Sequence, residues 1–193
     1  MNKVIFDVIH GFIEVDKITL SIIDTPEFQR LRNIKQLGAV HFVFPSANHT
    51  RFEHSLGVYY LAGELINNLK KNQPELNITE KEVLLVKIAG LCHDLGHGPF
   101  SHLLDEILKE KNLGSNLIEH EKRSIQILKY LVKKYNIELS DTDLNLIGNL
   151  IYPNDIEIND RQFLYEIVSN KRNGIDVDKF DYLKRDTFYL GMS

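Results

Sequence analysis

The sequence predicts a mainly α-helical bundle that begins with a short N-terminal β-hairpin and forms a single domain over residues 1–193. Apolar residues recur at helical spacing through most of the chain, and several of these segments open on a capping residue. Only residues 3–16 have the short apolar runs and central turn of two paired strands. No linker or internal repeat divides the chain, and its length suits one domain with its own core.

Turn and capping residues predict the N-terminal elements. The turn of the hairpin is expected at residues 10–11. Thr25 followed by Pro26 is typical of a helix N-terminus, because proline has no amide hydrogen to lose there. We therefore expect a helix from Pro26 to Leu37, ended by Gly38.

The remaining helices follow from apolar stripes that are bounded by caps or helix breakers. A long helix is expected from about residue 48 to 71, before Pro74. Thr79 and Glu82 form a capping box that opens a helix through Leu91, and this helix is apolar on most sides. Further helices are expected at 103–108, 120–132, 141–150, 161–169 and from 177 onward, with loops at 112–115 and 152–160.

Composition limits the class of protein. The net charge is −4 and the isoelectric point is near 6.1, so nucleic acid is not a predicted partner. No apolar run approaches the roughly 18 residues that a membrane span needs, and the first residues lack a signal-peptide profile. These features predict an intracellular protein of the nucleus or cytosol without membrane association. The single cysteine, Cys92, is expected in the core, with a metal-ligand or redox role as alternatives.

The pair His93-Asp94 places two types of metal ligand side by side where a helical pattern ends. His54 lies 39 residues before His93, and Asp178 lies 84 residues after Asp94. Two imidazoles and two carboxylates suit a divalent cation such as zinc, iron, manganese or magnesium. A site of this kind with open coordination positions performs hydrolysis. The alternative is a set of unrelated residues: a core histidine, a hydrogen-bonded pair at a helix end and a helix cap.

Long runs of sequence extend this pattern beyond the four residues. The segments 22–32, 51–58, 88–102 and 163–179 resemble the SAM-and-HD-domain deoxynucleoside triphosphate triphosphohydrolases, a family within the HD phosphohydrolase superfamily. The resemblance implies an HD-domain helical bundle and metal-dependent cleavage of deoxynucleoside triphosphates to deoxynucleoside and triphosphate. In that family the catalytic core continues beyond the residue that matches Ser193, so we expect this chain to correspond to the N-terminal part of that core.

The resemblance implies catalytic roles next to the metal ligands. The residues matching His97 and His120 act in proton transfer or bind the α-phosphate, and the residue matching Arg51 grips phosphate through its forked guanidinium. His102 is expected beside this set. From the residues alone, helix-end histidines often only bind backbone carbonyls, and Arg51 could form a surface ion pair with a neighbour such as Glu53.

The resemblance also implies contacts to a deoxyribose. Gln36 and Asp186 match residues that hydrogen-bond the 3′-hydroxyl of the sugar, and Leu37 matches a residue that excludes a 2′-hydroxyl. Lys179 and Tyr182 match a phosphate-binding lysine and a tyrosine beneath the sugar. Their alternatives are a solvated lysine and a core aromatic. Lys179, Tyr182 and Asp186 recur at spacings of three and four on the last predicted helix, so we expect them to face one pocket.

A regulatory site for GTP or a deoxynucleotide activator is implied in the same way. In the family this site lies between subunits, which implies a homo-oligomer. The residues that match it are Lys3, Val4, Asp24, Gln29 and Arg32. Phe6 departs from the family, where a polar asparagine is expected, and Asp24 could instead be a helix-start residue.

Two other functions compete with the triphosphohydrolase. The chain could be a weak or inactive metal-binding and nucleotide-binding fragment, because the family residues that close the phosphate and base pocket fall after the position of Ser193. It could also be another HD nucleotide phosphohydrolase with a looser sugar pocket. Gln36, Leu37 and Asp186 argue against the second alternative.

Overall fold

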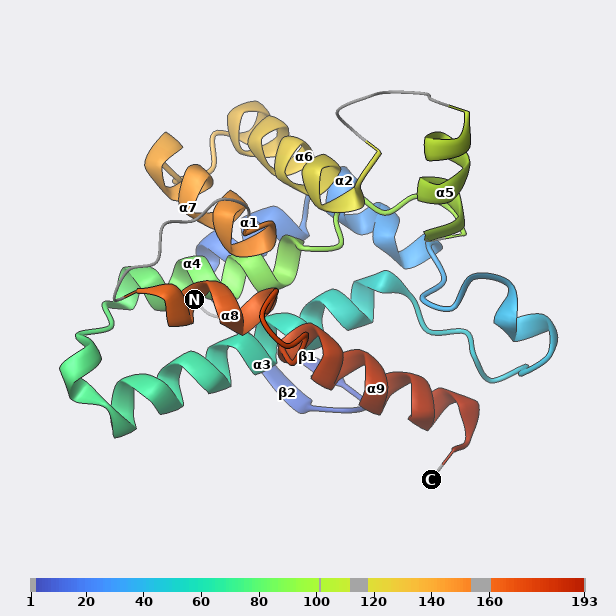
Figure 1. Ribbon diagram of the computed structural model, residues 1–193, viewed down its shortest axis with the longest axis horizontal. Helices are drawn as coiled ribbons and strands as arrows, with labels where there is room; N and C mark the ends of the chain where they lie inside the picture. Colours follow the sequence, from blue (N-terminus) through green and yellow to red (C-terminus); the bar gives the residue numbers. More distant parts are fainter. Residues whose placement is uncertain (1–2, 101, 112–117, 154–160, 193) are drawn as a thin grey trace.

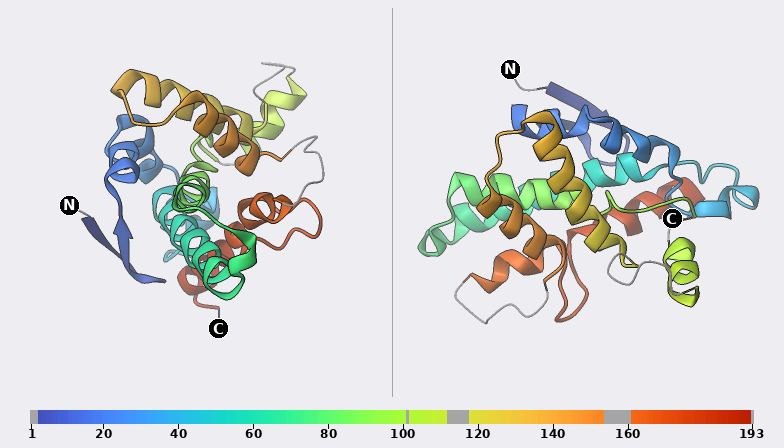
Figure 2. Two further views of the ribbon diagram at one scale, coloured as in Figure 1. Left: turned by 90° about the vertical axis from the view of Figure 1, so that its left-hand side faces the viewer. Right: turned by 90° about the horizontal axis from the view of Figure 1, so that it is seen from above.

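The computed structural model describes residues 3–100, 102–111, 118–153 and 161–192. These residues form a mainly helical domain with a two-stranded hairpin at its N-terminus, which confirms the predicted fold class (Figure 1). Two long helices, α3 (Arg51–Asn72) and α4 (Glu80–Cys92), pack along each other at its centre. The other elements surround this pair, as the view along it shows (Figure 2). None of the helices in the described ranges is long and apolar enough to cross a membrane.

The hairpin lies where the sequence predicts it. Strand β1 (Lys3–Asp7) pairs antiparallel with β2 (Gly11–Val15). Ile13 and Val15 are buried against the helices, whereas Phe6 and Phe12 are exposed on the other face. The hairpin therefore buries one face, as the alternating pattern of an antiparallel strand requires.

Helix α1 (Lys17–Ile23) was not expected from the sequence. Asp16 caps it, because its carboxylate accepts a hydrogen bond from the amide of Thr19 at 2.9 Å. With only seven residues, α1 is too short to show a clear helical period. The cap and the burial of Ile22 account for the helix.

The predicted helix from Pro26 to Leu37 is wrong beyond Asn33. Helix α2 (Pro26–Gln29) continues as the 3₁₀ helix η1 (Arg30–Asn33), and the chain is then extended at Ile34. The amide of Arg51 donates to the carbonyl of Ile34 at 2.9 Å, and the amide of Gln36 donates to the carbonyl of His49 at 3.1 Å. This long-range pairing replaces the helical hydrogen bonds.

Capping boxes set the starts of both central helices. Thr50 and Glu53 cap α3, so it begins at Arg51 rather than near residue 48. Thr79 and Glu82 cap α4 as predicted. Cys92, the last residue of α4, is a buried free thiol, which confirms the expected core position.

The remaining predicted helices are confirmed with small shifts of their ends. They are α5 (His102–Glu110), α6 (His120–Tyr135), α7 (Asp141–Ile151), α8 (Gln162–Val168) and α9 (Val177–Leu190). Two short 3₁₀ helices, η2 (Gly38–Phe42) and η3 (Pro74–Leu76), were not predicted. α7 packs against α6, α4 and α8, whereas α8 and α9 pack against α3 (Figure 2). The predicted loop at 112–115 and most of the predicted 152–160 connection lie outside the described residues.

Candidate active site

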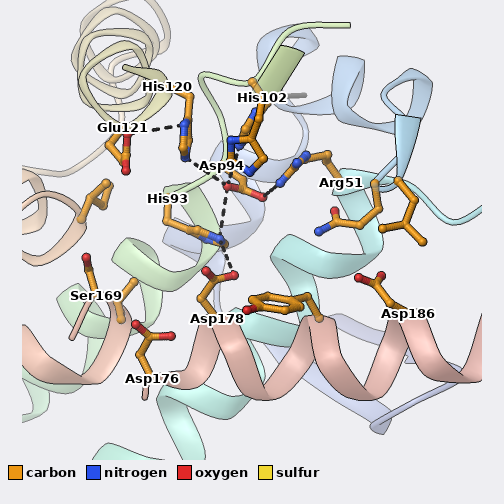
Figure 3. A pocket seen from close by; sticks show the side chains of 16 residues that line it. Arg51, His93, Asp94, His102, His120, Glu121, Ser169, Asp176, Asp178 and Asp186 are labelled. Carbon is orange, nitrogen blue, oxygen red and sulfur yellow. Dashed lines mark hydrogen bonds and ion pairs between the residues drawn. The ribbon is translucent and has the colours of Figure 1, made fainter. Parts of the chain in front are cut away.

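A cavity of about 370 Å³ opens between the end of α4, the starts of α5 and α6, helix α9 and the segment that precedes α3 (Figure 3). His93, Asp94 and Asp178 lie together in the cavity, and Asp186 lies farther along α9 (Figure 3). Gln36 also lines the cavity and is connected to Asp186 through His49. We call these two groups the metal end and the sugar end, after the roles expected of their residues. Segments distant in sequence therefore form a single site.

The structure brings the four predicted metal ligands together. His54 lies in the first turns of α3, His93 caps the end of α4, and Asp178 is the second residue of α9. The Nε2 atoms of His54 and His93 lie 3.0 and 3.3 Å from Asp178 Oδ1. The same two atoms lie 3.5 and 3.4 Å from the carboxylate oxygens of Asp94. His54, His93 and Asp178 therefore present ligand atoms that lie within 4.8 Å of one another, and the Asp94 carboxylate lies beside them.

The outer nitrogens of both rings have their own partners. His93 Nδ1 lies 2.8 Å from the carbonyl oxygen of Gly90, to which it must donate, so Nε2 carries the lone pair in the neutral ring. His93 Nε2 is buried and makes no hydrogen bond to the described residues. His54 Nδ1 lies 2.7 Å from Asp181 Oδ2. This arrangement is the one that metal-ligating histidines usually have, so the residues fit a divalent cation.

Electrostatics at the metal end keeps its carboxylates ionised. Burial would raise the pKa of Asp178, but His93 and His54 hold it well below its ordinary range. Burial would also raise the pKa of Asp94, but the positive charges of Arg51 and His93 lower it. Burial would lower the pKa of His54, but hydrogen bonds to Asp178 and Asp181 raise it to about 10. A cation would thus enter a site that already carries negative charge and would displace a proton.

Gly96 lets the loop after His93 approach α6. A Cβ atom at Gly96 would lie 2.1 Å from the carbonyl oxygen of His120, so no larger residue fits. Ser124 of α6 accepts a hydrogen bond from the Gly96 amide at 2.7 Å and donates one to the His93 carbonyl at 2.6 Å. The ligand-bearing loop is therefore tied to α6 at both of its ends.

Arg51 lies at the metal end and not on the surface. Its side chain is buried and its Nη1 pairs with Asp94 Oδ2. Glu53, the surface partner considered above, instead accepts a hydrogen bond from the amide of Thr50 at 2.6 Å. Arg51 also lines the cavity, so its guanidinium can reach a bound anion.

Three histidines form one wall of the cavity. The rings of His97 and His120 are stacked with centroids 3.8 Å apart, and His102 meets each of them edge-on. Burial lowers the pKa of His97 to about 4, although Asp94 partly offsets this effect. His120 Nδ1 lies 3.0 Å from Asp105 Oδ2, a carboxylate that the sequence did not single out. His97 is therefore uncharged at neutral pH, and His120 is anchored by a carboxylate.

At the sugar end, most of the predicted residues meet. Gln36, Leu37, Tyr182 and Asp186 all line the cavity. Lys179 does not line the cavity, so the expectation that it faces the same pocket is wrong. Its Nζ lies close to Gly174 in the loop before α9. Since Lys179 follows Asp178 directly on α9, a quarter turn of the helix separates their side chains.

His49 connects the two halves of the sugar end, and sequence reasoning missed it. Its Nε2 lies 2.6 Å from Asp186 Oδ1, and its ring stacks on Tyr189 with centroids 4.4 Å apart. Its carbonyl accepts the hydrogen bond from the Gln36 amide. His49 lies in an irregular segment without a helical or strand period, so no local signal marks it.

The residues matched to a regulatory site fall in two places. Lys3 and Val4 are exposed on β1. Asp24 ends α1 and is exposed, so it is not a helix-start residue. Gln29 donates to the carbonyl of Ile23 at 2.8 Å and accepts from Arg32 at 2.7 Å. The Arg32 guanidinium also lies 3.5 Å from the centre of the Phe52 ring, so these polar groups are held by neighbours within the chain.

Comparison with known proteins gives consistent matches. A family model described as the HD domain matches residues 51–186. The chain is 50% identical over 193 residues to "Deoxynucleoside triphosphate triphosphohydrolase SAMHD1 homolog" of Dictyostelium discoideum, which covers the whole chain and 37% of that protein. It is 48% identical over 210 residues to "Deoxynucleoside triphosphate triphosphohydrolase SAMHD1" of Homo sapiens, covering 98% of the chain and 34% of that protein. It is 44% identical over 197 residues to "Putative HD domain-containing protein L394" of Acanthamoeba polyphaga mimivirus, and this match covers 95% of the chain and 42% of that protein. The chain thus spans little more than a third of the length of the curated relatives it matches.

Proposed function

Because the chain belongs to the HD-domain family, we propose that it is a metal-dependent phosphohydrolase that cleaves deoxynucleoside triphosphates into deoxynucleoside and triphosphate. The convergence of two imidazoles and two carboxylates at 3.0–3.5 Å carries this proposal. The names of the relatives, deoxynucleoside triphosphate triphosphohydrolases, support the substrate class.

His54, His93, Asp94 and Asp178 are the residues that would hold the cation. Imidazole with carboxylate is compatible with zinc, iron, manganese or magnesium. When bound, a divalent cation supplies Lewis-acid activation of the phosphoryl group and of the attacking water.

The chain's own groups direct the attack and move the proton. Water attacks the α-phosphorus and the bond to the 5′-oxygen breaks, so the water oxygen leaves in triphosphate and a proton must reach the deoxynucleoside. Arg51 is placed to bind phosphate oxygens through its fork of donors. His97 is uncharged at neutral pH and can accept a proton, and Asp105 holds the ring of His120 beside it. We assign this pair to proton transfer or to binding of the α-phosphate.

The sugar end supplies the preference for a deoxynucleotide. Gln36 and Asp186 would hydrogen-bond the 3′-hydroxyl, Leu37 would exclude a 2′-hydroxyl, and Tyr182 would pack beneath the ring. His102, which contacts His120 on the histidine wall, would lie beside the phosphates. A phosphate contact from Lys179 would require its side chain to leave Gly174.

A second candidate function is a binding fragment with weak or no turnover, and the charge of the cavity favours it. Of the described residues that line the cavity, five are Asp or Glu, whereas Arg51 alone is Arg or Lys. A triphosphate is strongly anionic, so positioning it here depends on the cation and on further positive groups. Loose positioning can cost roughly a hundredfold in rate.

Regulation by GTP, with assembly into an oligomer, is a further part of the proposal. Lys3, Val4, Asp24, Gln29 and Arg32 would contact the activator. Gln29 and Arg32 would first have to exchange the partners they have within the chain. Stimulation by GTP and a shift in mass by light scattering would support this part.

The test is product analysis. The protein, loaded with Mn²⁺, is incubated with each deoxynucleoside triphosphate in H₂¹⁸O, with and without GTP, and products are separated by anion exchange and weighed by mass spectrometry. We expect deoxynucleoside without label and triphosphate with one ¹⁸O. The double variant His93→Ala with Asp94→Ala should form neither, whereas Glu64→Gln, an exposed position of α3 outside the cavity lining, is the control.

Other products would change the assignment. Monophosphate with pyrophosphate would show a different HD phosphohydrolase. Binding of Mn²⁺ and nucleotide without turnover would establish the binding fragment. Turnover that survives in the double variant would place the chemistry elsewhere.

A further inference from the structure

We propose that the N-terminal hairpin is a working part of the metal site: His10, at the hairpin turn, positions the ligand His54 through the buried carboxylate of Asp181. This inference rests on the proposed metal site. His10 and Asp181 are positioning residues, since neither of them faces the cavity where substrate would bind.

Two short contacts form the connection. Asp181 Oδ2 lies 2.7 Å from Nδ1 of His54, the nitrogen opposite the one that faces Asp178. The other oxygen, Asp181 Oδ1, lies 2.6 Å from Nε2 of His10. Asp178 and Asp181 are three residues apart on α9, so one helix face holds both nitrogens of the His54 ring.

Arg185 connects Asp181 to the hairpin residue Asp7. Its Nε and Nη2 donate to the two oxygens of Asp181 at 2.8 and 2.9 Å, and its Nη1 donates to Asp7 Oδ2 at 2.8 Å. Asp7 also accepts the backbone amides of Ile9 and His10 at 2.9 Å, so it fixes the turn. Asp181 and Arg185 are both fully buried. The position of His10 is therefore tied to α9 through two routes.

Helix α3 is shaped to admit this network. Gly57 lies one turn after His54, and a Cβ atom there would lie 1.9 Å from Asp181 Oδ1 and 2.5 Å from Arg185 Nη2. Any side chain at this position would push the carboxylate away from the helix. The His10 ring also packs against Tyr60 of α3, with centroids 5.2 Å apart. The close approach of α9 to α3 is what places Asp181 against the ligand ring.

The cost of this network argues for a role beyond holding the hairpin. Desolvating a buried charged group costs several kcal/mol, and apolar residues of similar volume often stabilise a fold as well or better. The hairpin already packs Ile13 and Val15 into the core. The hydrogen bonds from His10 through Asp181, however, end on Nδ1 of His54. They therefore fix the orientation of that ring, which decides whether Nε2 faces the cation.

Cobalt binding tests the inference. Co²⁺ is titrated into metal-free protein, with visible absorption to report its coordination and circular dichroism to confirm folding. The variants are Asp181→Asn, His10→Leu, His10→Gln and the double variant Asp181→Asn with His10→Leu. Phe12→Ser, an exposed position of the same hairpin, is the matched control.

We expect Asp181→Asn to weaken Co²⁺ binding by about tenfold or more, as loss of a ligand's outer partner does. His10→Leu should weaken it less. His10→Gln, whose amide can donate to Asp181 from near the position of Nε2, should recover much of the loss. Because His10 acts through Asp181, the double variant should bind like Asp181→Asn alone. Phe12→Ser should bind Co²⁺ as the unaltered chain does.

Two results would overturn the inference and differ from each other. If His10→Leu and Asp181→Asn melt at lower temperature but bind Co²⁺ with unchanged affinity and spectrum, the network is only structural and the metal site stands. If the unaltered chain does not bind Co²⁺, the metal site itself is wrong. Should Asp181→Asn fail to fold, His10→Leu and His10→Gln decide, because the hairpin turn lies at the edge of the domain.

Discussion

The two ends of the cavity are built in different ways. At the metal end, the ligands come from regular helices or the turn after one, and the outer nitrogen of each histidine is held by Asp181 or Gly90. At the sugar end, Gln36 and Leu37 come from an irregular segment, and His49 links that segment to Asp186. The histidines of the first end are oriented by partners on or beside helices, whereas the second end depends on a segment that precedes η2 and has no regular structure.

This difference indicates which property each end controls. A cation site tolerates little displacement, because coordination fixes distances closely. A sugar contact can be weakened gradually, since it changes affinity and discrimination more than the chemistry. We therefore expect substitutions at the metal end to abolish turnover, and substitutions at the sugar end to relax selectivity.

The largest effect is expected from loss of a ligand. Asp178→Asn removes a carboxylate that lies 3.0 Å from His54 Nε2. Several kcal/mol of lost transition-state stabilisation corresponds to a fall in kcat/KM of roughly a thousandfold. Initial rates with Mn²⁺ and each deoxynucleoside triphosphate measure it, with Glu64→Gln, at an exposed position of α3, as control. Near-normal turnover in Asp178→Asn would contradict the expectation that the metal end controls turnover.

The metal end should also have a distinct pH dependence. In metal-free protein the pKa of His54 is raised from 6.5 to about 10. The folded state then holds a proton that the unfolded chain releases, so this stabilisation is full below pH 6.5 and is lost as pH rises toward 10. We expect the free energy of unfolding of metal-free protein to fall by on the order of a few kcal/mol across this range.

Urea unfolding with a chelator at several pH values measures that fall. His54→Gln, which cannot titrate, should lose the part of the pH slope that belongs to His54. Metal affinity should change in the opposite direction and rise with pH, because the ligand must lose its proton. Equal slopes in the two proteins would contradict the charged state of His54.

A smaller effect is expected from the residue that connects the sugar end. His49→Phe keeps an aromatic ring against Tyr189 and the backbone carbonyl that binds Gln36, but it removes the contact to Asp186. A lost hydrogen bond to a charged group is worth about 1.5–3 kcal/mol, so the preference for a 3′-hydroxyl over a 3′-deoxy substrate should fall by about tenfold.

Competition between a deoxynucleoside triphosphate and its dideoxy analogue measures this preference. The matched control is Phe42→Ala, an exposed position of the same segment. An equal loss of turnover on both substrates would show that His49 supports the whole cavity and not the sugar end alone.

The smallest effect is expected at Leu37. Leu37→Ala opens space where a 2′-hydroxyl would lie, and a few methylene groups are worth only about 1–3 kcal/mol of discrimination. The ratio of kcat/KM for deoxynucleotides over ribonucleotides should therefore fall several-fold, with kcat on deoxynucleotides nearly unchanged. An unchanged ratio would show that Leu37 does not read the sugar.

Sequence reasoning located most helices but failed where distant segments decide the local structure. Capping boxes such as Thr79 with Glu82 act within one turn, so they could be read directly. The helix expected through Leu37 stops at Asn33, because Ile34 and Gln36 pair with residues near the start of α3. The side chain of Lys179 shows the same limit, since spacing predicts a face only approximately.

In the candidate site, residue type, order and the family resemblance predicted the four ligands. The structure groups His54, His93 and Asp178 within ligand distance of one another and places Asp94 beside them. His49, Asp105 and Asp181 were not found, because each acts on a residue distant in the chain and none belongs to a repeating pattern. Asp181 carried one usable signal, since it follows Asp178 by three residues on the same helix.

The sequence by itself determined the helical class, the N-terminal hairpin and the identity of the residues that can ligate a cation, because caps, apolar period and side-chain chemistry are local properties. Only the tertiary structure decided which carboxylate orients His54, and with it which nitrogen of that ring faces the other ligands, and which loop connects the sugar end. These features arise from contacts between elements that lie up to 171 residues apart, as His10 and Asp181 do. Close packing of α3 against α9 at Gly57 makes that contact to the metal end possible.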